Sequence, residues 1–162
     1  MSLADVFLGH HPRATAIRVA ALVAVAWVVF GWILMPVRLS GISMLPTYDS
    51  GAFNFANRAA YWLGEPARGD VVAIRMAGRR AVYVKRIIGL PGERIEIAQG
   101  TVLVNDEPLI ERAVLRRAPW DYAAVVLGPD EYFVVGDNRS MRIEHHDLGR
   151  VRRHRIVGKL LF

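Results

Sequence analysis

A run of 19 consecutive uncharged residues, Val19–Val37, is the strongest constraint that this sequence places on its fold. Arg18 and Arg38 bracket the run. A helix of this length rises by roughly 28 Å at about 1.5 Å per residue, close to the ~30 Å apolar core of a bilayer. We therefore expect residues 19–37 to form one transmembrane helix, with Pro36 at the helix exit.

A cleaved secretory signal is the alternative interpretation of this segment. Such signals have a shorter apolar region, typically ~7–15 residues, and end in an Ala-x-Ala-like site. Residues 19–37 are longer and end in Trp, Met and Pro, which favours an anchor that stays in the protein.

The charges beside the apolar run predict its orientation. The short tail, residues 1–18, carries Arg13 and Arg18 against one acid, Asp5, so the positive-inside rule places it in the cytoplasm, although Arg38 reduces the asymmetry. Residues 38–162 then lie outside the cytoplasm. The expected protein crosses the cytoplasmic (inner) membrane once.

Composition narrows the possible partners and chemistry. The net charge is +6, but the basic residues are dispersed and no winged-helix, RNA-recognition or zinc-finger pattern accompanies them, so we expect no nucleic-acid partner. The chain has no Cys, which excludes thiolate nucleophiles, disulfides, zinc ribbons and iron–sulfur ligation.

Beyond Arg38 the sequence changes to short apolar runs separated by Gly, Pro, Asn and Asp at intervals of about ten residues, a pattern typical of all-β regions. No repeat or low-complexity linker divides it, so residues 38–162 are predicted to form one antiparallel β domain. The expected strands are 51–59, 70–76, 81–88, 94–97, 101–104, 131–135 and 155–161.

Turn residues and apolar positions sharpen this prediction. Gly100 separates two of these runs and Asn105-Asp106 follows the second, which predicts a hairpin whose turns use residues tolerant of positive φ. A sharp reversal is expected at residues 89–92. The expected core consists of Val71, Val72, Ile74, Val82, Val84, Ile87 and Ile88.

A lysine in an apolar strand is the first sign of catalysis. The chain has 19 Arg but only two Lys, and one of them, Lys85, stands among β-branched and aromatic residues. Arg keeps its proton in proteins, whereas a desolvated Lys can lose it and act as a general base.

The octapeptide 40–47, just after the apolar run, offers a hydroxyl nucleophile in Ser43. A turn with a solvated hydroxyl is the alternative interpretation of this segment. Because the chain lacks Cys, a Ser-x-Gly elbow and an H-E-x-x-H motif, a Ser–Lys pair is the most economical hydrolytic centre available to it.

Four segments resemble, in order, the sequence boxes of type I signal peptidases, membrane-anchored Ser–Lys proteases that remove signal peptides. They are SGISMLPT (40–47), RGDVVAIR (68–75), YVKRIIGLPGE (83–93) and FVVGDNRS (133–140). Their ordered combination is far more specific than any single box. The resemblance implies a mainly β fold of signal-peptidase type, with one N-terminal transmembrane helix followed by an antiparallel β-sheet catalytic domain.

The resemblance also implies roles for the matching residues. Ser43 would attack the scissile carbonyl and form an acyl-enzyme, and Lys85 would take its proton and later activate water. The backbone N–H of Ser43 would form part of the oxyanion hole. Turn and oxyanion support would come from Ser40, Gly41, Met44, Pro46 and Thr47.

Support for the dyad is expected mainly from the segment 136–146. Arg86 would pair with Asp137 and so hold the strand that carries the lysine. The remaining support residues are Asn138, Arg139, Ser140 and Glu144.

This chain departs from the family pattern at two places. Many members have a lysine-orienting Ser where Arg142 stands and an Arg where His146 stands, which leaves Ser140 as a substitute partner for the lysine. Some members have a second oxyanion donor, a Ser, where this chain has Gly41. Ser40, a backbone group or a water would replace it.

The short distance from the apolar run to Ser43 predicts an active site at the membrane surface. A signal peptide would bind there by β-augmentation and be cut after an Ala-x-Ala-like, small-x-small sequence. Ile42, Leu45, Val82 and Tyr83 are the candidate pocket residues. The expected partners are preprotein signal peptides and the lipid bilayer, and the protein is expected to be monomeric.

Neither a cofactor nor a metal is expected. The sequence Glu144-His145-His146-Asp147 suggests a metal cluster, but adjacent histidines in a strand would point to opposite faces. Alternative functions are a specialised peptidase that matures a pilin or conjugation component, and a catalytically silent membrane-anchored β scaffold. A self-cleaving repressor is disfavoured because no DNA-binding helix pair is present.

Overall fold

The computed structural model describes residues 12–75, 82–114, 116–146 and 148–162, and the chain divides into two compact units, Met1–Met35 and Pro36–Phe162. In the first unit, the α-helix α2 (Pro12–Val28) continues into a π-helical segment, η1 (Val29–Ile33). The 21-residue stretch Arg13–Ile33 is long and apolar enough to cross a membrane.

The helix begins and ends earlier than the predicted span 19–37. Leu34–Arg38 forms strand β1, so Pro36 lies in a strand and not at a helix exit. β1 is at the edge of its sheet, where the missing N–H of a proline is tolerated. Hydropathy did not locate this boundary because Val37 is apolar for another reason: it is buried in the second unit.

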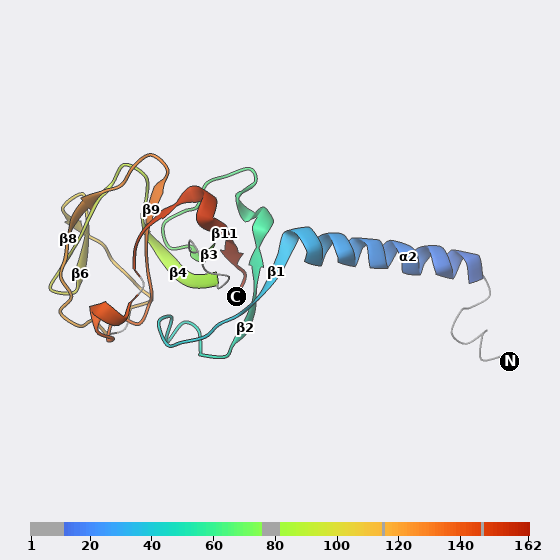
Figure 1. Ribbon diagram of the computed structural model, residues 1–162, viewed down its shortest axis with the longest axis horizontal. Helices are drawn as coiled ribbons and strands as arrows, with labels where there is room; N and C mark the ends of the chain where they lie inside the picture. Colours follow the sequence, from blue (N-terminus) through green and yellow to red (C-terminus); the bar gives the residue numbers. More distant parts are fainter. Residues whose placement is uncertain (1–11, 76–81, 115, 147) are drawn as a thin grey trace. The chain divides into compact units, whose positions relative to one another are not determined.

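The second unit contains two sheets of antiparallel strands (Figure 1). The larger has the order β1-β2-β11-β3-β4-β9-β10 and the smaller the order β7-β6-β5-β8. Besides β1, the larger sheet contains β2 (Phe53–Asn57), β3 (Val71–Arg75), β4 (Val82–Gly89), β9 (Glu131–Val135), β10 (Gly149–Arg152) and β11 (Ile156–Leu160).

The smaller sheet contains β5 (Arg94–Ala98), β6 (Thr101–Val104), β7 (Glu107–Pro108) and β8 (Tyr122–Val126). The described residues of this unit also form three short 3-10 turns, η2 (Arg58–Tyr61), η3 (Ile143–His145) and η4 (Arg153–Arg155). In Figure 1, β6 and β8 lie at the end of this unit opposite β2.

The predicted fold class is confirmed, and all seven predicted strands are present with ends shifted by no more than two residues. Four strands were not predicted: β1, β7, β8 and β10. β7 has only two residues, and β10 carries arginines at both exposed positions, Arg150 and Arg152, so neither has an extended apolar pattern.

The hairpin turns predicted from Gly and Asn-Asp are also confirmed. Gln99-Gly100 joins β5 to β6 with φ of 48° and 80°, and Asn105-Asp106 joins β6 to β7 with φ of 51° and 69°. Two consecutive residues in the left-handed region match the twist of the strands that they connect.

Both faces of the larger sheet are buried because successive residues of its central strands point to opposite sides. One cluster joins the two sheets and contains Ile88, Ile95, Ile97, Val102, Trp120, Leu127, Phe133 and Val135. The cluster on the other face contains Val72, Ile74, Ile87, Tyr132, Val134, Val151 and Ile156. Of the seven predicted core residues only Val82 is not buried, and it lines a pocket.

Candidate active site

The turn that carries Ser43 begins directly after β1. Paired hydrogen bonds close its base: the Leu39 N–H donates to the Ala52 carbonyl and the Gly51 N–H to the Leu39 carbonyl, both at 2.9 Å. Gly41 has φ of +97°, a conformation that favours glycine. Met44 is buried beneath the turn, which fixes its position on the domain.

The loop after β9 holds this turn by its backbone. The Asn138 N–H donates to the Ser43 carbonyl at 3.0 Å, and the Asn138 side-chain amide donates to the Ile42 carbonyl at 2.9 Å. A Cβ at Gly136 would lie 2.2 Å from the Ser43 carbonyl oxygen, so only glycine permits this approach. The two predicted boxes 40–47 and 133–140 therefore meet at Ser43.

A buried carboxylate, Asp137, unites all four boxes. Arg86 donates to it through Nε at 2.8 Å and Nη2 at 2.6 Å, Thr47 donates its hydroxyl at 2.5 Å, and the third Arg86 nitrogen, Nη1, donates to the Gly69 carbonyl at 2.7 Å. The predicted contact between Arg86 and Asp137 is thus present. The hydrogen bond to Asp137 raises the pKa of Arg86 above its ordinary value.

Lys85 is a buried side chain on an interior strand of the larger sheet. It lies on β4, opposite Val72 of β3, and is only 4% exposed. The cavity beside it, of about 90 Å³, is mostly apolar. Its lining residues are Ile74, Tyr83, Lys85, Val134, Leu148, Gly149, Arg150 and Val151.

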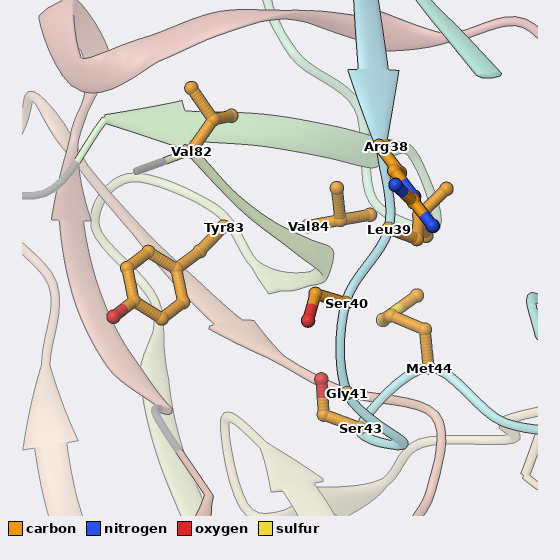
Figure 2. Close-up of a pocket in the computed structure, with 9 residues that line it drawn as sticks. All are labelled: Arg38, Leu39, Ser40, Gly41, Ser43, Met44, Val82, Tyr83 and Val84. Carbon is orange, nitrogen blue, oxygen red and sulfur yellow. The ribbon is translucent and has the colours of Figure 1, made fainter. Parts of the chain in front are cut away.

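Ser43 lines a larger pocket of about 420 Å³ between the segment 38–44 and β4 (Figure 2). Val82, Tyr83 and Val84 form the β4 wall, and in Figure 2 the hydroxyls of Ser40 and Ser43 point toward one another. Tyr83 also lines the Lys85 cavity, so one residue borders both spaces. The pocket thus presents a half-buried hydroxyl to a space large enough for a peptide side chain.

Other predicted site residues lie outside this pocket. Of the four candidate pocket residues, Val82 and Tyr83 line it, whereas Ile42 is 49% exposed and is not among its lining residues. Leu45, Pro46 and Ser140 line a separate depression of about 250 Å³, together with Arg116, Asp137 and Asn138.

Several residues of the segment 140–146 contact one another or Asn138. The Ser140 hydroxyl donates to the Asn138 side-chain oxygen at 2.6 Å. Arg142 and Glu144 are 77% and 62% exposed and pair with each other at 3.3 Å. His146, which follows η3 and not a strand, is buried with Nε2 2.9 Å from the Asn138 carbonyl.

Asp147, the last member of the suggested metal cluster, lies outside the described residues.

Sequence reasoning missed Glu111. This side chain is 6% exposed and pairs with Arg139, which is 1% exposed and also donates from Nε to the Gly136 carbonyl at 3.0 Å. Burial raises the pKa of Glu111 above its ordinary value. The surrounding segment 109–121 contains none of the four boxes and no regular apolar pattern, so no sequence signal marked it.

Residues 13–162 match the family model described as signal peptidase, peptidase S26. The chain is 32% identical to a signal peptidase I of Bacillus amyloliquefaciens over 151 residues, which are 86% of this chain and 78% of that protein. It is 31% identical to the signal peptidase I T of Bacillus subtilis over 158 residues, 91% of this chain and 81% of that protein.

Among solved structures, a signal peptidase I from Enterococcus faecalis matches 60% of this chain and 97% of its own, with 26% identity and a TM-score of 0.49.

Proposed function

This chain belongs to the signal peptidase family, peptidase S26, and we propose that it removes signal peptides from secreted preproteins with Ser43 as nucleophile and Lys85 as general base. The observation that carries the proposal is the pocket beside β4. Ser43 lines it, and the next residue of β4 after its wall is the buried Lys85.

The proposed reaction is acyl transfer in two steps. The Ser43 Oγ attacks the scissile carbonyl carbon while Lys85 Nζ accepts the hydroxyl proton and passes it to the leaving amine. Water, deprotonated by the same amine, then hydrolyses the ester and restores Ser43. The Ser43 N–H stabilises the oxyanion, with Ser40 as a second hydroxyl lining the same pocket.

Burial supports the base role of Lys85. Desolvation disfavours the charged form of an amine, and the cavity around Lys85 is lined mostly by apolar side chains. Thr47, Arg86 and Asp137 would support the dyad by fixing β4 and the end of the Ser43 turn against one another.

The pocket shape supports a substrate bound as an extended strand between residues 38–41 and β4. Leu39, Met44 and Val84 give this pocket an apolar lining, which suits the small apolar side chains expected before the cleavage site. We further propose that Arg13–Ile33 anchors the protein in the cytoplasmic membrane, with the catalytic domain outside the cytoplasm and the protein acting as a monomer on lipid-embedded signal peptides.

Cleavage of a preprotein with an Ala-x-Ala site, by the full chain in detergent, tests the proposal. Ser43→Ala and Lys85→Ala should lower kcat on the order of 10³-fold or more. Lys159→Ala, at the second lysine, and Thr101→Ala, in the smaller sheet, are the matched controls and should cleave like the wild type.

Mass spectrometry of the products should locate the cut after the small-x-small sequence. Cleavage that survives in Ser43→Ala or Lys85→Ala would overturn the proposal. A correctly folded wild type that cuts no preprotein would favour the β scaffold, and a cut confined to a pilin-type substrate would favour the specialised peptidase.

A further inference from the structure

A buried ion pair lies behind the Ser43 turn and has no part in the proposed chemistry. Glu111 and Arg139 contact each other through one carboxylate oxygen and Nη2, with side-chain exposures of 6% and 1%. Burying two charges is costly unless each is well paired, so this contact needs an explanation beyond stability.

The pair is connected to Ser43 by a short series of hydrogen bonds. Arg139 Nε donates to the Gly136 carbonyl at 3.0 Å. Two residues later, the Asn138 N–H donates to the Ser43 carbonyl at 3.0 Å. Contacts and the short chain segment 136–138 therefore link Glu111 and Arg139 to the backbone of Ser43.

The surroundings of Arg139 make it dependent on Glu111. Its guanidinium lies 5.5 Å from the centre of the Trp120 ring, and its Nη1 has no hydrogen-bond partner among the described residues. Glu111 also lies 3.8 Å from Arg117 and interacts electrostatically with Arg86. Asp137 also acts on Arg139 electrostatically, but among the described residues Glu111 is the carboxylate in direct ion-pair contact with the guanidinium, so without it the buried charge would lose that contact.

We propose that Glu111 is a positioning residue for the reaction: by holding Arg139 it sets the loop 136–138, and through Asn138 the backbone of Ser43, in the geometry that attack requires. This inference rests on the proposed function. Glu111 does not line the pocket of about 420 Å³, so it acts on turnover and not on substrate binding.

Glu111→Gln is the direct test because it removes the charge and keeps the side-chain size. In the full chain in detergent, well below its melting temperature, kcat should fall about tenfold with KM unchanged, since misplacing a reacting group costs rate. Glu111→Asp, which keeps the charge, should recover part of kcat.

Glu93→Gln is the matched control. Glu93 pairs with Arg68 in a partly buried position, 17% and 28% exposed, and among the described residues its side-chain contacts are with Arg68 and the Leu90 N–H and not with the loop 136–138. The variant Glu93→Gln should lower the melting temperature, as Glu111→Gln should, but leave kcat unchanged. Equal kcat in the wild type and in folded Glu111→Gln would overturn the inference and leave the proposed function intact.

Two further measurements separate positioning from general destabilisation. Combining Glu111→Gln with Asn138→Ala should lower kcat no further than the stronger single variant, because both act through one support. A multiplicative loss would contradict this. A measurement that does not depend on cleavage is hydrogen exchange at the backbone N–H of Asn138. Compared with the wild type, exchange should be faster in Glu111→Gln and unchanged in Glu93→Gln. Unchanged exchange would overturn the inference even if the proposed function failed.

Discussion

The two lysines of this chain occupy the same row of one sheet and have opposite environments. Both pair with Val72 of β3, Lys85 from β4 on one side and Lys159 from β11 on the other. Lys85 is 4% exposed beside an apolar cavity, whereas the Lys159 side chain is 48% exposed and contacts Asp70 at 2.6 Å.

This comparison indicates that the position of a lysine in the sheet, through its burial and contacts, determines which role the side chain can take. β9 flanks β4 on its other side and the segment 148–151 lines the Lys85 cavity, so the side chain is shielded from bulk solvent. Lys159 instead contacts Asp70 in a half-exposed pair at the surface. One lysine suits proton transfer and the other suits stability.

The largest expected contrast is in kcat for preprotein cleavage, between the variants Lys85→Arg and Lys159→Arg. Arginine keeps a positive charge but cannot act as a base, so Lys85→Arg should lower kcat by about 10²–10⁴-fold. Lys159→Arg keeps the pair with Asp70 and should cleave normally. Preprotein cleavage at matched folded concentration measures both. An active Lys85→Arg would mean that only the charge matters.

The second-largest contrast is expected between the two aspartates, Asp137 near Lys85 and Asp70 beside Lys159, in their contribution to stability. Asp137 is 2% exposed and holds Arg86, so Asp137→Asn should lower the free energy of unfolding by about 2–4 kcal/mol, since it leaves a charge poorly compensated. Asp70→Asn should cost about 1–2 kcal/mol, because its partner Lys159 is half exposed. Urea unfolding measures both, and equal losses would contradict the comparison.

The smallest effect is the pH dependence of the Asp70 contribution. Burial acts to raise the pKa of Asp70, but hydrogen bonds from Lys159, the Ala67 N–H and Tyr61 hold it below the ordinary 3.8. The unfolded chain therefore binds this proton more readily than the folded chain. The difference in unfolding free energy between the wild type and Asp70→Asn should be constant at pH values well above the ordinary pKa of 3.8. It should shrink as the pH falls through 3.8 toward the lower pKa of the folded chain. A difference that persisted to lower pH would refute this.

Much of the fold followed from local patterns. The hairpin at Gln99-Gly100 could be predicted because turn chemistry is local, and the central strands β3, β4 and β9 because their apolar residues are nearly continuous. β1 could not be separated from the apolar helix before it, since Val37 is as apolar as a lipid-facing residue but is buried by tertiary contacts.

Some contacts of the candidate site could likewise be predicted from the sequence, and others could not. The pairing of Arg86 with Asp137 was predictable because both residues fall within recognised boxes. The contacts of Arg142 and Glu144 with each other, and of Glu111 with Arg139, depend on how loops fold back over the sheets. No spacing rule in the sequence encodes such contacts.

Trapping of the acyl-enzyme tests the central claim most directly. A reaction of the full chain with a preprotein, quenched in acid within the first turnover, should yield the signal peptide joined by an ester to the fragment that contains Ser43. The adduct should be absent in Ser43→Ala and Lys85→Ala and present in Lys159→Ala. An adduct on another residue, or one that forms without Lys85, would contradict the account.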